Sequence, residues 1–259
     1  MLIKIIFLGI VQGLTEFLPI SSSGHLVLIE KTLNLSLSSF LSCTAFFHLG
    51  TTLAIIFYFR RRIYEICKNI FQPQAQRSES IRIVVNVAIG SIPVAIIGYF
   101  LRSHIEYFFS SRLYFVGLFL IINGILLFVT KFITARNIQL TPWRSLTIGI
   151  AQALALLPGI SRSGITITTG LILGLSSVSS FEFSFLLALP AIIGANILVL
   201  REIVFHFSII DFIIGFFVPF IIGVGALRLL NKMVIDKKFY HFAYYSWFLG
   251  VLILPVGLL

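Results

Sequence analysis

The chain has 259 residues, of which 58% are hydrophobic and 11% are charged, and its mean hydropathy is +1.06. These values exclude an ordinary soluble domain and are typical of an integral membrane protein that crosses the bilayer several times. The net charge of +10 would point to nucleic acid in a soluble chain. Here the Lys and Arg residues fall mostly between apolar segments, which is the usual topology pattern. We therefore expect membrane lipids, and no nucleic acid, as partners.

Apolar segments recur along the chain, and several are long enough to cross a hydrocarbon core of about 30 Å. They cover residues 2–18, 40–59, 83–101, 113–132, 146–157, 165–175, 183–200, 209–230 and 242–259. The first apolar segment, interrupted by Gln12 and Glu16, has no small-residue cleavage site after it, so we expect membrane sequence and not a signal peptide. That segment and the pair at 146–157 and 165–175 are short and end at breaks rich in Pro, Gly and Ser. Such breaks predict re-entrant or broken helices, which a membrane tolerates only where irregular backbone lines a cavity.

The two breaks resemble each other in sequence. A shift of 140 residues aligns Val11–Leu14 with Ala151–Leu154 and Ile20–Gly24 with Ile160–Gly164, and Gln, Ser and Gly recur at matching positions. Polar identities are harder to obtain by chance than matches between apolar residues. We therefore predict a single membrane domain, residues 1–259, with internal repeats at about 1–100 and 141–240.

The basic residues predict the orientation. If residues 60–82 are cytoplasmic and both breaks are re-entrant, thirteen Lys and Arg residues lie inside and five outside, which obeys the positive-inside rule. The outer five are Lys4, Lys31, Arg102, Arg112 and Arg201. An odd number of crossings separates the breaks, so they enter from opposite faces. The fold class is thus an all-α polytopic membrane protein with an inverted-topology repeat, whose two loops meet in a central pocket. Cys43 and Cys67 fall near opposite faces and are expected to be unpaired packing residues.

The second break, Pro158–Thr166, combines an arginine, three hydroxyls and two glycines. Glycine lets backbone N–H groups approach an anion, hydroxyls donate hydrogen bonds, and guanidinium binds phosphate bidentately. Arg162 lies between apolar flanks, and an arginine at membrane depth indicates a functional site. The alternative is a loop at the bilayer surface whose Arg162 contacts lipid headgroups.

The first break supplies groups for catalysis. Gln12 and Glu16 share a helix face, and Ser21–His25 follow closely. A serine needs a nearby base to attack phosphorus, and Glu16 or His25 could serve. Alternatively, Glu16 forms only a structural ion pair with Arg162, His25 binds a carbonyl at a helix start, and the serines cap a helix.

These residues carry a resemblance. Gln12–His25 and Pro158–Thr166 resemble the two signatures of the bacterial undecaprenyl-pyrophosphate phosphatases, the bacitracin-resistance family, and Glu182–Pro190 continues the match. The resemblance spans essentially the whole chain. It implies a hydrolase of the bacterial inner membrane that removes the terminal phosphate of undecaprenyl pyrophosphate and so recycles the lipid carrier for peptidoglycan synthesis. It also implies a pocket open to the outer, periplasmic side.

The resemblance also implies the site. Catalytic roles fall to Glu16, Ser22 as the nucleophile, His25 and Arg162. Substrate and phosphate binding fall to Gln12, Ser21, Ser23, Ser161, Ser163 and Thr166. A divalent cation, Mg²⁺ or Ca²⁺, is expected as cofactor. Because Gln12 stands where a carboxylate is common in the family, Glu16 is the sole acidic candidate ligand, and the metal is expected to be held largely by the diphosphate.

Two further positions depart from the family pattern. His48 stands where Gln is expected, with no role that the sequence assigns, and the region of Tyr245 and Ser246 lacks an expected Arg. The alternative function is a transporter or flippase of a phosphorylated polyprenyl lipid, because inverted repeats with broken helices also build transporters. A carrier needs phosphate-binding groups but no nucleophile and base, so Ser22, Glu16 and His25 favour the phosphatase.

Overall fold

The computed structural model describes residues 2–33, 37–110, 113–134, 136–200 and 209–256. The described residues form helices and connecting loops, with no strand among them. In chain order the helices are α1 (Leu2–Thr15), α2 (Ser22–Leu33), α3 (Leu37–Tyr58), α4 (Arg60–Asn69), α5 (Gln74–Ser110), α6 (Leu113–Val129), η1 (Thr130–Phe132), α7 (Pro142–Leu154), α8 (Arg162–Ile172), α9 (Ser177–Leu200), α10 (Ile209–Ile235), η2 (Phe239–His241) and α11 (Phe242–Val256). The side chains of Cys43 and of four of the five predicted outer basic residues, all except Lys4, lie outside the described part.

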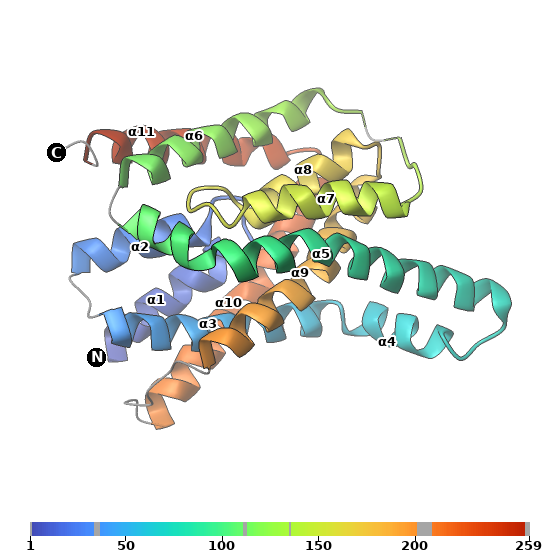
Figure 1. Cartoon of the computed structure of the whole chain (residues 1–259), viewed down its shortest axis with the longest axis horizontal. Helices are drawn as coiled ribbons and strands as arrows, with labels where there is room; N and C mark the ends of the chain where they lie inside the picture. Colours follow the sequence, from blue (N-terminus) through green and yellow to red (C-terminus); the bar gives the residue numbers. More distant parts are fainter. Residues whose placement is uncertain (1, 34–36, 111–112, 135, 201–208, 257–259) are drawn as a thin grey trace.

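The helices form one bundle along the long axis of the molecule, with both termini near one end and the α4–α5 turn at the other (Figure 1). Within the described residues, four stretches are long and apolar enough to cross a membrane: Gln74–Leu101, Leu113–Phe132, Ser177–Ile197 and Ile209–Ile235. Their outward side chains include exposed Ile, Val and Phe residues, as expected for helices that face lipid. The chain is therefore an all-α, multi-pass membrane protein, as the sequence predicts.

Two boundaries differ from the predicted segments. Helix α5 begins at Gln74 and not at residue 83. The polar residues before the apolar segment also favour helix, so the helix starts before the segment that enters lipid. Residues 60–69, predicted only as part of a basic loop, form the amphipathic helix α4. Hydropathy finds where a helix enters lipid, which need not be where the helix begins.

Both predicted breaks interrupt helices. Helix α1 stops at Thr15 and α2 starts at Ser22, while α7 stops at Leu154 and α8 starts at Arg162. Figure 1 shows the outer ends of α1 and α2 toward the end that carries the termini, and those of α7 and α8 toward the opposite end. The re-entrant course within a membrane and the duplication of the chain stay predictions.

The helix packing positions both breaks at the centre of the bundle. Helix α1 packs on α10, α7 packs on α5, and α6 lies along α11. The α5–α7 contact depends on Gly149, where a Cβ would collide with the carbonyl oxygen of Gly90; small residues allow such close approach in membrane helices. The fully buried rings of Phe17 and Phe185, 5.8 Å apart, anchor the core beside the first break.

Candidate active site

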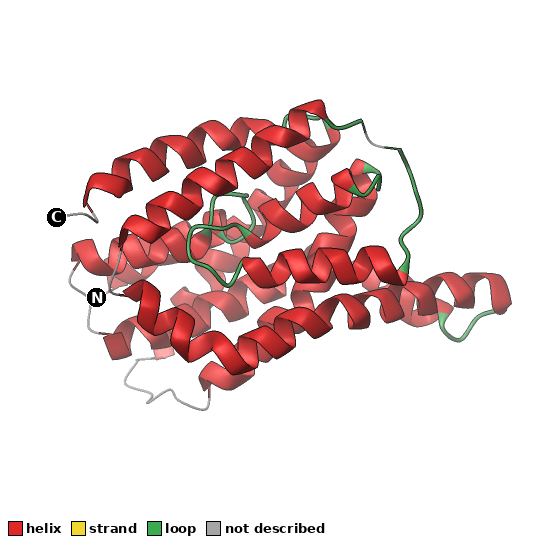
Figure 2. Cartoon of the chain, turned by 45° about the horizontal axis from the view of Figure 1, so that its top comes forward, coloured by secondary structure: helices red, strands yellow, loops and turns green. Residues whose placement is uncertain are grey.

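The two loops between the helix halves meet in the middle of the molecule (Figure 2). The backbone N–H of Gly159 donates to Ser21 Oγ at 3.0 Å, and Ser163 Oγ donates to the carbonyl of Phe17 at 2.8 Å. Gly159 has φ +110°, a conformation that glycine adopts at little cost, and Ser21 takes φ +68°. The structure thus brings the two sequence motifs together.

Asn123 of α6 connects both loops. Its Nδ2 donates to the carbonyl of Pro19 at 2.8 Å, and its Oδ1 accepts from the backbone N–H of Ser161 at 3.0 Å. The same Nδ2 lies 3.1 Å from Ser246 Oγ on α11, and Asn123 is fully buried. One amide therefore fixes the first loop against the second.

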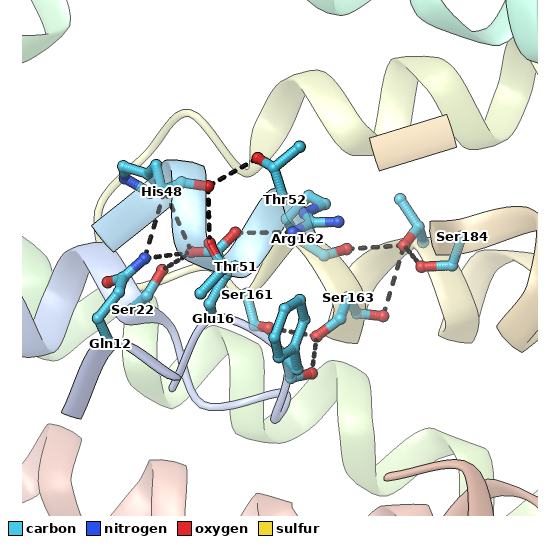
Figure 3. A network of polar contacts seen from close by, with 12 residues as sticks. Gln12, Glu16, Ser22, His48, Thr51, Thr52, Ser161, Arg162, Ser163 and Ser184 are labelled. Atoms are coloured by element: carbon cyan, nitrogen blue, oxygen red, sulfur yellow. Dashed lines mark hydrogen bonds and ion pairs between the residues drawn. The ribbon is translucent and has the colours of Figure 1, made fainter. Parts of the chain in front are cut away.

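The Glu16 carboxylate is the centre of the polar network in Figure 3. Its Oε1 accepts from Arg162 Nη2 at 2.7 Å, and its Oε2 accepts from Ser22 Oγ at 2.8 Å and from Gln12 Nε2 at 3.0 Å. The Glu16 side chain is 7% exposed and that of Arg162 is 15% exposed. A buried carboxylate needs such charge and hydrogen-bond partners, so Glu16 is positioned both to orient Arg162 and to accept a proton from Ser22.

Two buried atoms beside this carboxylate have no hydrogen-bond partner within the described part of the chain, Arg162 Nη1 and Gln12 Oε1. Buried polar atoms are usually satisfied. An unsatisfied guanidinium donor suits a phosphoryl oxygen, and an unsatisfied amide oxygen suits a cation or a hydroxyl. Both atoms therefore indicate a polar ligand at this site.

His48 of α3 joins the network on the side of Gln12. Its Nδ1 lies 3.3 Å from Gln12 Nε2 and 3.9 Å from Glu16 Oε2. Thr51 and Thr52 both donate to the carbonyl of His48, which fixes its place on the helix. The position that the sequence left without a role thus contacts the acidic motif.

His25 has a different environment from Ser22. Its Nδ1 lies 2.7 Å from the carbonyl of Ser21, and its Nε2 lies 2.7 Å from the hydroxyl of Tyr245 on α11, whose ring stacks on the imidazole. Since a carbonyl only accepts, Nδ1 carries the proton and Nε2 accepts from Tyr245. With both nitrogens engaged, His25 bridges the first loop to α11, and Glu16 is the base that directly contacts Ser22.

The remaining predicted residues have protein partners in this state. Ser161 Oγ caps α8 by accepting from the N–H of Gly164, and it lies 3.2 Å from Ser163 Oγ. Thr166 Oγ1 donates to the carbonyl of Arg162 and lies 2.6 Å from Ser184 Oγ. Ser23 Oγ lies 3.3 Å from Ser21 Oγ. These hydroxyls hold the loops, and their role in phosphate binding stays a prediction.

Sequence reasoning missed Asn123, and it gave no role to Tyr245. Asn123 is the single amide in the otherwise apolar helix Leu113–Val129, and an isolated polar residue in such a segment is a detectable signal. Tyr245 carries no comparable signal, because it lies among other aromatic residues of α11.

The fold and site define a class: a multi-pass membrane protein in which two interrupted helices bring an arginine, a buried carboxylate and a partly exposed serine together. The sequence model described as "Bacitracin resistance protein BacA" matches residues 5–252. The chain therefore belongs to the bacitracin resistance protein BacA family.

Curated relatives agree with this assignment. The chain is 34% identical to an undecaprenyl-diphosphatase of Methanobrevibacter smithii over 97% of this chain and 96% of the relative. It is 36% identical to that of Desulfosudis oleivorans and 37% identical to that of Caldicellulosiruptor bescii, each over 98% of this chain and 97% of the relative. The similarity therefore covers both loops and all the described helices.

Proposed function

We propose that this protein is an undecaprenyl-diphosphatase, a hydrolase that converts undecaprenyl pyrophosphate to undecaprenyl phosphate and inorganic phosphate. The activity recycles the lipid carrier for peptidoglycan synthesis and confers bacitracin resistance. Family membership and the names of the relatives support it. The observation that carries it is the meeting of Ser22 and Arg162 on the buried Glu16 carboxylate, with Arg162 Nη1 left for a ligand.

The contacts around Glu16 support the following proposed steps. Glu16 accepts the proton of Ser22 Oγ, and Ser22 attacks the terminal phosphorus as the bond to the bridging oxygen breaks, leaving undecaprenyl phosphate. Arg162 stabilises the charge on the transferring phosphoryl group. Water then hydrolyses the phosphoserine. In the alternative course, Glu16 and Ser22 orient a water molecule that attacks phosphorus directly.

A divalent cation, Mg²⁺ or Ca²⁺, fits this site if the diphosphate supplies most of its ligands. Within the described residues, no three His, Cys, Asp or Glu side chains gather as a metal site. The oxygen donors present are the Glu16 carboxylate and the unsatisfied Gln12 Oε1, and one carboxylate beside substrate phosphates is a common arrangement for Mg²⁺. A bound cation would neutralise charge on the phosphoryl oxygens.

We further propose that the protein lies in the bacterial inner membrane, with the pocket open to the periplasmic side. The basic residues support this orientation, since α4, which carries Arg60–Arg62, lies toward the end of the bundle opposite the termini (Figure 1).

The test is phosphate release from undecaprenyl pyrophosphate by purified protein in detergent, with and without Mg²⁺, alongside Arg162→Ala and Ser22→Ala. We expect release by the wild type and its loss in Arg162→Ala. Loss in Ser22→Ala supports seryl attack, and retention supports direct attack by water. No release by folded wild-type protein that still binds the lipid would overturn the phosphatase and favour the transporter or flippase.

A further inference from the structure

An apolar groove lies between α5, the α7–α8 loop and α9, outside the polar site. Its volume is about 400 Å³, within the range of about 300–1,000 Å³ of ligand pockets, which are also mostly apolar. Residues that shape it include Ala95, Gly98, Leu156, Ala191, Gly194 and Ala195. The groove therefore has the volume of a ligand-binding site, and its lining suits an apolar ligand.

The small residues of the groove face open space and not a packed helix. No heavy atom of the described chain lies within 4 Å of the position that a Cβ of Gly194 would take, and the nearest atom to that of Gly98 belongs to Leu156, at 4.0 Å. Small residues in membrane helices usually let two backbones approach closely. Here α5 and α9 instead leave a gap that a second molecule can fill.

The groove adjoins the second loop, which carries part of the candidate active site. Leu156, which lines the groove, comes three residues before Gly159, whose N–H donates to Ser21. On α9, Ser184 contacts Thr166. Residues seven and eleven positions further on share that helix face, and these are Ala191 and Ala195 of the groove. The side of α9 that meets α8 thus leads directly into the groove.

The two repeats differ beside the second loop. At the shift of 140 residues that aligns the motifs, Leu156 takes the place of Glu16, and Ala191 takes that of Thr51. Where the first repeat places polar groups at the candidate active site, the second places hydrocarbon along the groove. A substrate with one polar end and one apolar end needs both surfaces.

We propose that this groove binds the isoprenoid chain of the diphosphate lipid, an inference that rests on the proposed function. The groove lies in the halves of α5 and α9 that lead toward the end of the bundle with the termini, the predicted outer side (Figure 1). The lipid's diphosphate is hydrolysed at the same side in the proposed orientation. Walls of Ala and Gly leave width for a chain that carries a methyl branch on every unit.

The test compares Gly194→Leu with Gly225→Leu. Gly194→Leu adds a side chain to the groove at a position where a Cβ meets no heavy atom within 4 Å. The Cβ position of Gly225 on α10 is equally open, but Gly225 is not part of the groove. Steady-state kinetics are measured with undecaprenyl pyrophosphate and with isopentenyl diphosphate, which carries a single isoprene unit. We expect Gly194→Leu to raise KM for the long substrate at least about tenfold, with little change for the short one, and Gly225→Leu to change neither. Equal effects on both substrates, or in both variants, would overturn the proposal.

A binding measurement separates this inference from the proposed function. A polyprenyl diphosphate with a photoreactive chain is crosslinked to wild-type protein, with undecaprenyl pyrophosphate or phosphatidylglycerol as competitor. We expect crosslinks to the peptides around Tyr99 and Gly194 that only undecaprenyl pyrophosphate removes. Competition by phosphatidylglycerol would show that ordinary membrane lipid fills the groove. Crosslinks without phosphate release in any assay would reject the phosphatase and retain the groove.

Discussion

Arg162 presents two terminal nitrogens in an arrangement that a lysine cannot reproduce. One of its terminal nitrogens binds Glu16 at 2.7 Å, and the other is buried without a partner in the described chain. The planar guanidinium fork presents both nitrogens in fixed geometry, whereas an ammonium is a point charge. We expect Arg162→Lys to keep the ion pair but to lower kcat/KM by at least about 100-fold, the usual effect of removing one preorganised donor.

Thermal unfolding in detergent checks that interpretation. Arg162→Lys is expected to unfold near the wild-type temperature. Arg162→Ala leaves the buried Glu16 charge unpaired, which typically lowers the free energy of unfolding by about 3–5 kcal/mol. This variant is therefore expected to unfold well below the wild-type temperature. Wild-type turnover in Arg162→Lys would show that the second nitrogen does not bind the substrate.

Ser21 and Ser22 are neighbours with different expected roles. Ser22 is partly exposed and donates to Glu16, so Ser22→Ala is expected to reduce kcat by at least about 100-fold through loss of the attacking hydroxyl, while the base Glu16 remains. Its stability should fall by only about 1 kcal/mol, the net value of one hydrogen bond, because Glu16 keeps its bonds to Arg162 and Gln12. Ser21 accepts from Gly159 N–H, and Ser21→Ala is expected to cost about 1–3 kcal/mol by leaving that group unsatisfied. Phosphate release and thermal unfolding of both variants measure this contrast, and an unstable Ser22→Ala would contradict it.

At the level of elements, α6 holds the two loops through Asn123. We expect Asn123→Ala to leave the N–H of Ser161 and the carbonyl of Pro19 without partners, costing about 1–3 kcal/mol for each buried group. Because the loops carry Glu16 and Arg162, kcat should fall more than KM rises. Ser246→Ala is the matched control, since it removes a partner of Asn123 and leaves both loop contacts intact. Equal effects of the two variants would show that the loops keep their positions without Asn123.

The sequence could predict the two loops but not what holds them. Breaks rich in Pro, Gly and Ser between apolar halves are local features of the sequence. The Gln, Ser and Gly residues that recur in both breaks indicated a shared pocket. The contacts from Asn123 to Pro19 and from Tyr245 to His25 join residues 104 and 220 positions apart. Such pairings depend on which helix packs beside which, and local periodicity carries no information on that. The Gln12–His48 contact was missed for the same reason.

At the scale of the whole molecule, one end is stabilised by charge. Arg62 of α4 donates through Nε to Glu182 of α9 at 2.6 Å, and its other nitrogens lie 3.6 Å from Glu79 and 3.7 Å from Glu65. Partial burial opposes ionisation of Arg62, but the Glu182 hydrogen bond and the three carboxylates raise its pKa overall. Such a charged network is compatible with water and not with the hydrocarbon core, so this end of the bundle lies outside the membrane.

Cys67 makes the sidedness of that end measurable. It is an exposed free cysteine on α4, beside the charged network, and replacing Cys43 by Ala makes it the single thiol of the chain. In the proposed orientation, a membrane-impermeant maleimide should label Cys67 in inverted inner-membrane vesicles and leave it unlabelled in intact spheroplasts.

A second reporter completes the measurement. Ile209→Cys, introduced without Cys43 and Cys67, places an exposed thiol at the start of α10, toward the end of the bundle that carries the termini (Figure 1). It should show the reverse labelling pattern, because α10 crosses from that end to the side of α4. Labelling of Cys67 in spheroplasts would invert the proposed orientation, and with it the side from which undecaprenyl pyrophosphate enters. Labelling of both thiols from one side would mean that an odd number of the predicted crossings between them is wrong. Two of these crossings, α5 and α6, also enter the argument that the two loops come from opposite faces.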